Sequence, residues 1–140
     1  MAITYCGGDK LVHNREIITA GANLAGKTLV TAAGTVPSSA AGGSFAVTPN
    51  DVASGDTFSG KNGIGSIIEV LATGTVTAGT QVEVLTTTIN ANINGTSTSV
   101  TAAGVSTIAS GFPVGVAKTS GDSGSYVLIE WNPTAKGAVA

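Results

Sequence analysis

The stretch GSIIEVLATGTVTAGTQVEVL, residues 65–85, decides the fold class because it reads as two strands joined by a glycine-containing turn. Residues 65–72 and 80–86 are rich in β-branched side chains and are bounded by Gly, Ser and Thr. In the second strand Val alternates with Gln and Glu, which predicts one buried and one solvent-facing side. The first strand is apolar on both faces apart from Glu69, so we expect a central strand covered on both sides.

Further segments along the chain share this strand character. They comprise residues 16–20, 27–32, 44–48, 112–118 and 125–131. The last of them is also apolar on both faces, and we expect it to be a second central strand. Gly, Thr, Ser and Val interrupt every window that could form an apolar helical stripe. The sequence therefore predicts an all-β fold, either a small barrel or a compact sandwich, with long polar loops.

The composition of the 140-residue chain limits its class and its partners. Only 10% of the residues are charged and 42% are hydrophobic, which argues against a self-repelling disordered chain. The six Lys and Arg residues are scattered singly and the net charge is −2, so we expect no nucleic-acid partner. No apolar run reaches the roughly 18 residues of a membrane span, and the N-terminus lacks a signal-peptide pattern. We therefore expect a protein made in the cytoplasm, without a membrane partner.

Residues 87–107, TTINANINGTSTSVTAAGVST, form the most polar stretch and carry no charge. Asn94 and Gly95 stand between two strand-like runs, which is a strong signal for a two-residue hairpin turn. We interpret the stretch as a protruding hairpin or long loop whose exposed tip is Asn94-Gly95. A solvated finger is one interpretation of it, and a neutral hydrogen-bonding contact to a glycan is another.

GANLAGKT, residues 21–28, matches the phosphate-loop pattern at every fixed position. That motif needs a helix after the loop, whereas here β-branched residues are followed by Gly34 and Pro37, which do not sustain one. Residues 72–82 resemble residues 19–29 and keep the Ala-Gly turn without the lysine. We therefore interpret the motif as a structural turn and Lys27 as a solvated strand-edge residue that discourages edge pairing.

Other catalytic patterns are also weak. GDSG at residues 121–124 surrounds a serine as in trypsin-like proteases, but Ser123 would need a histidine base, and His13 is the only histidine. We interpret this motif as a turn between strands. Cys6 is the only cysteine, which excludes an internal disulfide, and the acidic residues are spread singly. We expect no enzyme and no catalytic, metal or cofactor-binding residues.

The order of these segments resembles the small phage capsid decoration proteins, also called cement proteins. The resemblance rests on residues 65–85 and on FPVGVAKTSGDSGSYVLIEW, residues 112–131, with its Val-Gly-Val-Ala, its glycine-containing linker and its final hydrophobic strand. It extends over residues 17–131. It implies a β-barrel or β-tulip domain that binds the outside of a phage head as a homotrimer. The implied partner is the major capsid protein, and the implied location is the outer surface of the virion.

The segment that contacts the capsid is a separate hypothesis. Residues 1–16 form an N-terminal arm or first strand ahead of a β domain at residues 17–140. Ile3 and Tyr5 could anchor in grooves of the shell, while Lys10 and Arg15 could meet acidic residues. A frayed end is the alternative for this segment. For the whole protein, the alternative function is a glycan- or receptor-binding β module of a virion or cell surface.

Overall fold

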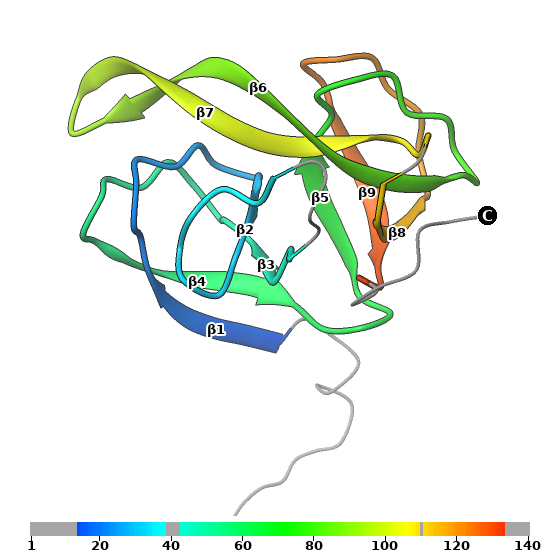
Figure 1. The fold of residues 1–140 in the computed structure, drawn as a ribbon, viewed down its shortest axis with the longest axis horizontal. Coiled ribbons are helices and arrows are strands. Elements are labelled where there is room, and N and C mark those ends of the chain that lie inside the picture. Colours follow the sequence, from blue (N-terminus) through cyan, green and yellow to red (C-terminus); the bar gives the residue numbers. More distant parts are fainter. Residues whose placement is uncertain (1–13, 39–42, 110, 134–140) are drawn as a thin grey trace, which may run out of the picture.

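The computed structural model describes residues 14–38, 43–109 and 111–133, which form nine strands and no helix. The strands are β1 (Asn14–Thr19), β2 (Leu29–Val30), β3 (Ala46–Val47), β4 (Thr57–Asn62), β5 (Ile67–Leu71), β6 (Gln81–Ile93), β7 (Thr96–Thr107), β8 (Pro113–Ala117) and β9 (Tyr126–Trp131). They build two antiparallel sheets, in the orders β1-β4-β3-β2 and β5-β9-β8-β6-β7 (Figure 1). The all-β prediction is confirmed in its sandwich form. The described strands do not close into a barrel.

The two sheets are two copies of one arrangement. β1 corresponds to β5, β2 to β6, β3 to β8 and β4 to β9, and corresponding strands have corresponding neighbours. Backbone hydrogen bonds recur in the same way. Gly55 donates to the carbonyl oxygen of Ala20 (2.8 Å) in the first half, and Gly124 donates to that of Ala72 (2.7 Å) in the second. Only β7 lacks a counterpart, so the β6–β7 hairpin is an addition to the second half.

Within the described residues, each half contains two corresponding tight turns, one that leads into β2 or β6 and one that leads into β4 or β9. In each turn, the residue that stands two positions before the first residue of the strand has a positive φ. That left-handed residue is Gly55, Gly79 or Gly124 in three copies and Lys27 in the fourth. The similarity between residues 19–29 and 72–82 reflects this duplication, but the structure shifts the alignment by one residue. Lys27 corresponds to Gly79.

The β6–β7 hairpin lies across the first sheet (Figure 1). Asn94 and Gly95 form its turn with φ of 53° and 85°, as a two-residue turn of this kind requires, and both are exposed. The underside of the hairpin is buried against the turns of the first half. This cluster contains Ala25, Ala91, Ile93, Val100 and Ala102. The stretch expected to protrude therefore has one packed face, and its outward face and tip meet solvent.

A single carboxylate fastens the hairpin to the first half. Asp51 Oδ1 accepts a hydrogen bond from the Gly26 amide, and Oδ2 accepts one from the Asn92 amide, both at 2.7 Å. Because hydrogen bonds to a charged acceptor are stronger than neutral ones, this residue fixes the position of the outer part of β6.

The second sheet curls until its two edge regions touch. Ala72, just after β5, forms a parallel bridge with Val105 of β7, and Thr73 donates a hydrogen bond to the Val105 carbonyl oxygen (3.0 Å). Gly104 permits this approach, because a side chain there would overlap the Leu71 carbonyl oxygen. The main core lies inside the curl and includes Ile68, Val70, Val82, Ile129 and Trp131. Leu29 and Val47 join it from the first sheet, so the two halves meet in this cluster, while the first half also has a cluster of its own around Ile18 and Phe58.

Candidate interaction surface

The outer face of β5 and β9 exposes large apolar side chains. Ile67, Tyr126 and Leu128 are 43%, 53% and 38% exposed, whereas the inward residues Val70 and Ile129 are fully buried. The prediction that both strands are covered on both sides is therefore wrong for the described chain. β5 stands at the end of the sheet order, and within the described residues the apolar side chains of this face are exposed except at Leu71, which is buried. An apolar face of this kind is a typical mark of an interaction site.

The strand register arranges this face as a chequerboard. Ile67 stands opposite Glu130, Glu69 opposite Leu128, and Leu71 opposite Tyr126. Ile67, Leu128 and Leu71 are consequently diagonal neighbours, which are close enough for long side chains to touch. Together with Tyr126, which stands opposite Leu71, they form an apolar stripe on the two strands that is exposed at Ile67, Leu128 and Tyr126 and buried at Leu71. We call this stripe, with the charged residues beside it, the β5–β9 face.

Two ion pairs neutralise the β5–β9 face. Lys27 Nζ lies 3.0 Å from Glu69 Oε1, and Lys118 Nζ lies 3.2 Å from Glu130 Oε1. All four side chains are between a third and a half exposed, so each pair contributes little to stability. Their main effect is on the charge of the surface, because each glutamate on the face has a lysine partner.

Lys27 occupies a constrained place beside this face. Its φ of 57° puts a non-glycine residue in the left-handed region. Its amide donates to the Thr48 carbonyl oxygen (2.9 Å), and its own carbonyl oxygen accepts from the Leu71 amide (2.7 Å). The ammonium also lies 6.0 Å from the centre of the Tyr126 ring. The prediction of a solvated strand-edge residue is wrong, because Lys27 sits in a turn that joins the first half to the end of β5.

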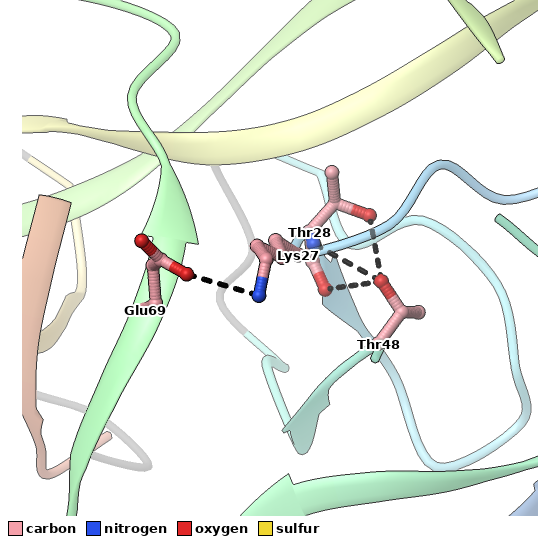
Figure 2. A network of polar contacts seen from close by, with 4 residues as sticks. All are labelled: Lys27, Thr28, Thr48 and Glu69. Atoms are coloured by element: carbon pink, nitrogen blue, oxygen red, sulfur yellow. Dashed lines mark hydrogen bonds and ion pairs between the residues drawn. The ribbon is translucent and has the colours of Figure 1, made fainter. Parts of the chain in front are cut away.

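The phosphate-loop motif forms a turn that uses its amides internally, and Figure 2 shows one of these hydrogen bonds, from the Thr28 amide to the Thr48 hydroxyl. The Gly26 amide is bound to Asp51, the Lys27 amide to the Thr48 carbonyl, and the Thr28 amide to the Thr48 hydroxyl at 3.1 Å. A phosphate-binding loop needs such amides free to point at its ligand. In this conformation the three amides of residues 26–28 are therefore not free to donate hydrogen bonds to a phosphate.

Ser123 of the GDSG motif lies in the tight turn that leads into β9. Its hydroxyl donates to the Thr73 carbonyl oxygen at 3.0 Å, which ties the turn to the end of β5. His13 and Cys6 lie outside the described residues. The absence of enzymatic activity stays a prediction. Within residues 14–38, 43–109 and 111–133, no group of three His, Cys, Asp or Glu side chains could hold a metal ion.

The proposed capsid-contact residues are mostly outside the structure. Ile3, Tyr5 and Lys10 lie in the part of the chain that is not described. Arg15 belongs to β1, where its backbone pairs with that of Lys61. Nothing in the described part brings Arg15 together with the exposed tip at residues 94–95. The part of the chain that the structure describes contains no helix, and so no helix that could span a membrane.

The β5–β9 face is the surface that sequence reasoning missed. Its signal was present in the two segments that read as apolar on both faces, but the pattern was attributed to coverage by the same chain. Comparison of the chain with protein-family models, with curated proteins and with solved structures finds no match.

Proposed function

We propose that the protein is a structural decoration protein that binds the outside of a phage head as a homotrimer and braces its major capsid protein. The observation that supports this proposal is the neutral, apolar β5–β9 face. A protein that cements a shell needs a rigid body with faces for protein contact, and this chain offers such a face on a two-sheet body.

The construction of the body suits a mechanical role. The two halves meet in the main core cluster, and Asp51 fastens the long hairpin to the first half. Because each copy of an oligomer can hold its own capsid subunit, attachment at several points raises the overall affinity through effective concentration. Binding to the assembled shell would stabilise that shell by mass action. On this proposal the protein is made in the host cytoplasm and resides on the outer surface of the virion.

Undecorated heads test this proposal directly. Purified protein is mixed with them, unbound protein is removed by sedimentation, and bound copies are counted by quantitative gel analysis. We expect saturation near three copies for each threefold position of the shell. A variant that lacks residues 1–8 tests the N-terminal arm, which contains Ile3 and Tyr5. Lower occupancy supports the arm as a contact, and unchanged occupancy removes it. Absence of binding by the full chain overturns the decoration function.

A second candidate function is glycan binding, and a cleft beside the hairpin tip favours it. The cleft has a volume of about 400 Å³ and is lined by Asp51, Asp56, Asn92 and Asn94, among others. Carboxylate and amide groups of this kind can hydrogen-bond sugar hydroxyls. Saturation-transfer NMR with neutral mono- and disaccharides tests it. Binding that is lost in Asp56→Asn and kept in Asp122→Asn would support this function. No transfer from any sugar would exclude it.

A further inference from the structure

We infer that the β5–β9 face is covered by a second copy of this chain. The inference names the partner of the surface on which the proposed function rests, but its test needs no phage head. It starts from the outward side chains of β9 on this face, where Leu128 and Tyr126 are 38% and 53% exposed.

The duplicated fold provides an internal comparison for this face. The corresponding face of the first half lies on β1 and β4, where Thr57 takes the place of Tyr126 and Ser59 the place of Leu128. Thr57 is exposed and Ser59 is half-buried, and both are polar. The β1 strand of that face does expose Ile17, opposite Ser59, so the comparison concerns β4 and β9 alone. Since β4 carries polar residues at these two positions, the fold does not require apolar residues on β9, and their presence there points to a contact that the described part of the single chain does not make.

The stripe continues into a hollow at the end of β5. The hollow has a volume of about 440 Å³ and lies between the end of β5, the hairpin and Tyr126. Its lining is apolar at Leu71, Ala72 and Ile89 and also includes neutral Thr and Ser side chains, and no charged residue is among the described residues that line it. A partner must therefore present a neutral surface here.

The chain itself displays apolar groups of this kind. Ile64 is 76% exposed in the turn between β4 and β5, where Gly63 and Gly65 both have positive φ. It precedes β5, whereas the hollow lies at the other end of that strand. One copy thus carries an exposed apolar side chain and an apolar hollow at separate places, so a second copy can supply what the first lacks.

The charges also favour a second copy. The whole chain carries a net charge of −2, while Lys27, Glu69, Lys118 and Glu130 make the β5–β9 face neutral. Like-charge repulsion between two identical molecules is therefore small at this face. The lysine and glutamate of each ion pair are also half-exposed, so they can exchange partners across an interface between identical copies. A strongly acidic or strongly basic partner would find no complementary charge here.

Sedimentation equilibrium over a range of protein concentrations tests this inference. Leu128→Lys places a charge in the centre of the stripe, and its outward position allows the lysine to reach solvent in a single copy. Ser59→Lys is the matched control, because it makes a lysine at the corresponding position of the first half. We expect the wild type and the control to associate equally, and Leu128→Lys to associate roughly tenfold or more weakly. A monomeric wild type, or equal association of all three proteins, overturns the inference.

A crosslinking experiment covers the case in which Leu128→Lys does not fold. Cys6→Ser removes the only cysteine, and Leu128→Cys or Ser59→Cys then places a single thiol on one of the two faces. A short bis-maleimide reagent should join copies through Cys at position 128 and not at position 59. Equal yields at the two positions contradict the inference. Copies that associate through this face without binding heads would disprove the decoration function alone. Heads that bind monomers would disprove the inference and the homotrimer, but not the decoration function itself.

Discussion

Lys27 and Gly79 hold the same position in the two halves of the fold: each is the left-handed residue of the turn that leads into β2 or β6. Their amides make corresponding hydrogen bonds, from Lys27 to Thr48 and from Gly79 to Ala117. At a position where glycine carries no steric penalty, the first half keeps a lysine whose ammonium neutralises Glu69. The lysine that balances the charge of Glu69 on the β5–β9 face thus has a strained backbone conformation.

The strain at Lys27 can be separated from its ion pair by two substitutions. Lys27→Ala loses the ion pair and keeps the strain, whereas Lys27→Gly loses the ion pair and relieves the strain. We expect the free energy of unfolding of the glycine variant to exceed that of the alanine variant by about 1 kcal/mol. Urea denaturation measures both. The control is Gly79→Ala, which should lower the free energy of unfolding by about 1 kcal/mol or more. Equal stability of the two Lys27 variants would contradict the assigned conformation.

Replacement of Asp51 should loosen the hairpin. Asp51→Ala removes the acceptor of the Gly26 and Asn92 amides, and we expect a loss of about 2 kcal/mol in the free energy of unfolding. Hydrogen exchange followed by NMR should be faster at those two amides than in the wild type. Asp122→Ala is the control, because this acid lies in a turn of the second half and no amide of the described residues donates to its carboxylate. Unchanged exchange at Asn92 would show that Asp51 does not fasten the hairpin.

Thr48 and Thr28 should differ in their importance although both are buried. Each hydroxyl donates to the Ala25 carbonyl oxygen at 2.7 Å, but only the Thr48 hydroxyl also accepts from the Thr28 amide (Figure 2). Thr48→Val leaves that buried amide without an acceptor, which costs about 1 to 3 kcal/mol. Thr28→Val leaves the Ala25 oxygen with one donor and should cost less. Thermal or urea unfolding ranks the two variants, and the reverse order would refute this account.

Gly104 should not tolerate a side chain. A Cβ atom there would overlap the Leu71 carbonyl oxygen, a backbone atom that cannot rotate away, so Gly104→Ala should cost roughly 2 to 3 kcal/mol. Gly74→Ala is the matched control, because its Cβ would meet the side-chain ends of Ser106 and Leu85. Those atoms can move, and the penalty should be smaller. Denaturant midpoints compare the two variants. An equal loss would mean that the approach of β7 to β5 is not tight.

The sequence predicted the strands that are rich in β-branched and aromatic residues and missed β4, which is not. Seven predicted segments overlap β1, β2, β3, β5, β6, β8 and β9. β4, with the sequence TFSGKN, was not predicted, because Gly, Lys and Asn are poor strand formers in isolation. It forms because β1 pairs with it over six residues, and because Gly60 leaves room for Ala46 and Ile18. Such long-range support is invisible in a local window.

The duplicated fold was visible in the sequence only in part. The conserved feature is the backbone conformation of a turn, and three of its four left-handed residues are glycine. Because the fourth left-handed residue is Lys27 and not glycine, the sequence alignment of the two halves paired Gly26 with Gly79 and was displaced by one residue. The β5–β9 face could not be assigned for a different reason. Alternation of side chains indicates which faces are apolar, but it does not distinguish a face covered by the same chain from one covered by another molecule.

The β6–β7 hairpin has a consequence for how the chain can be lengthened. It extends the link between the second and third strands of the second half, and the corresponding link in the first half is the connection from β2 to β3. One half therefore demonstrates that this link accepts a long excursion while the surrounding strands keep their register. The β2–β3 connection is therefore the natural place to graft a foreign peptide. The β6–β7 hairpin shows that the same connection in the second half already accepts a long insertion.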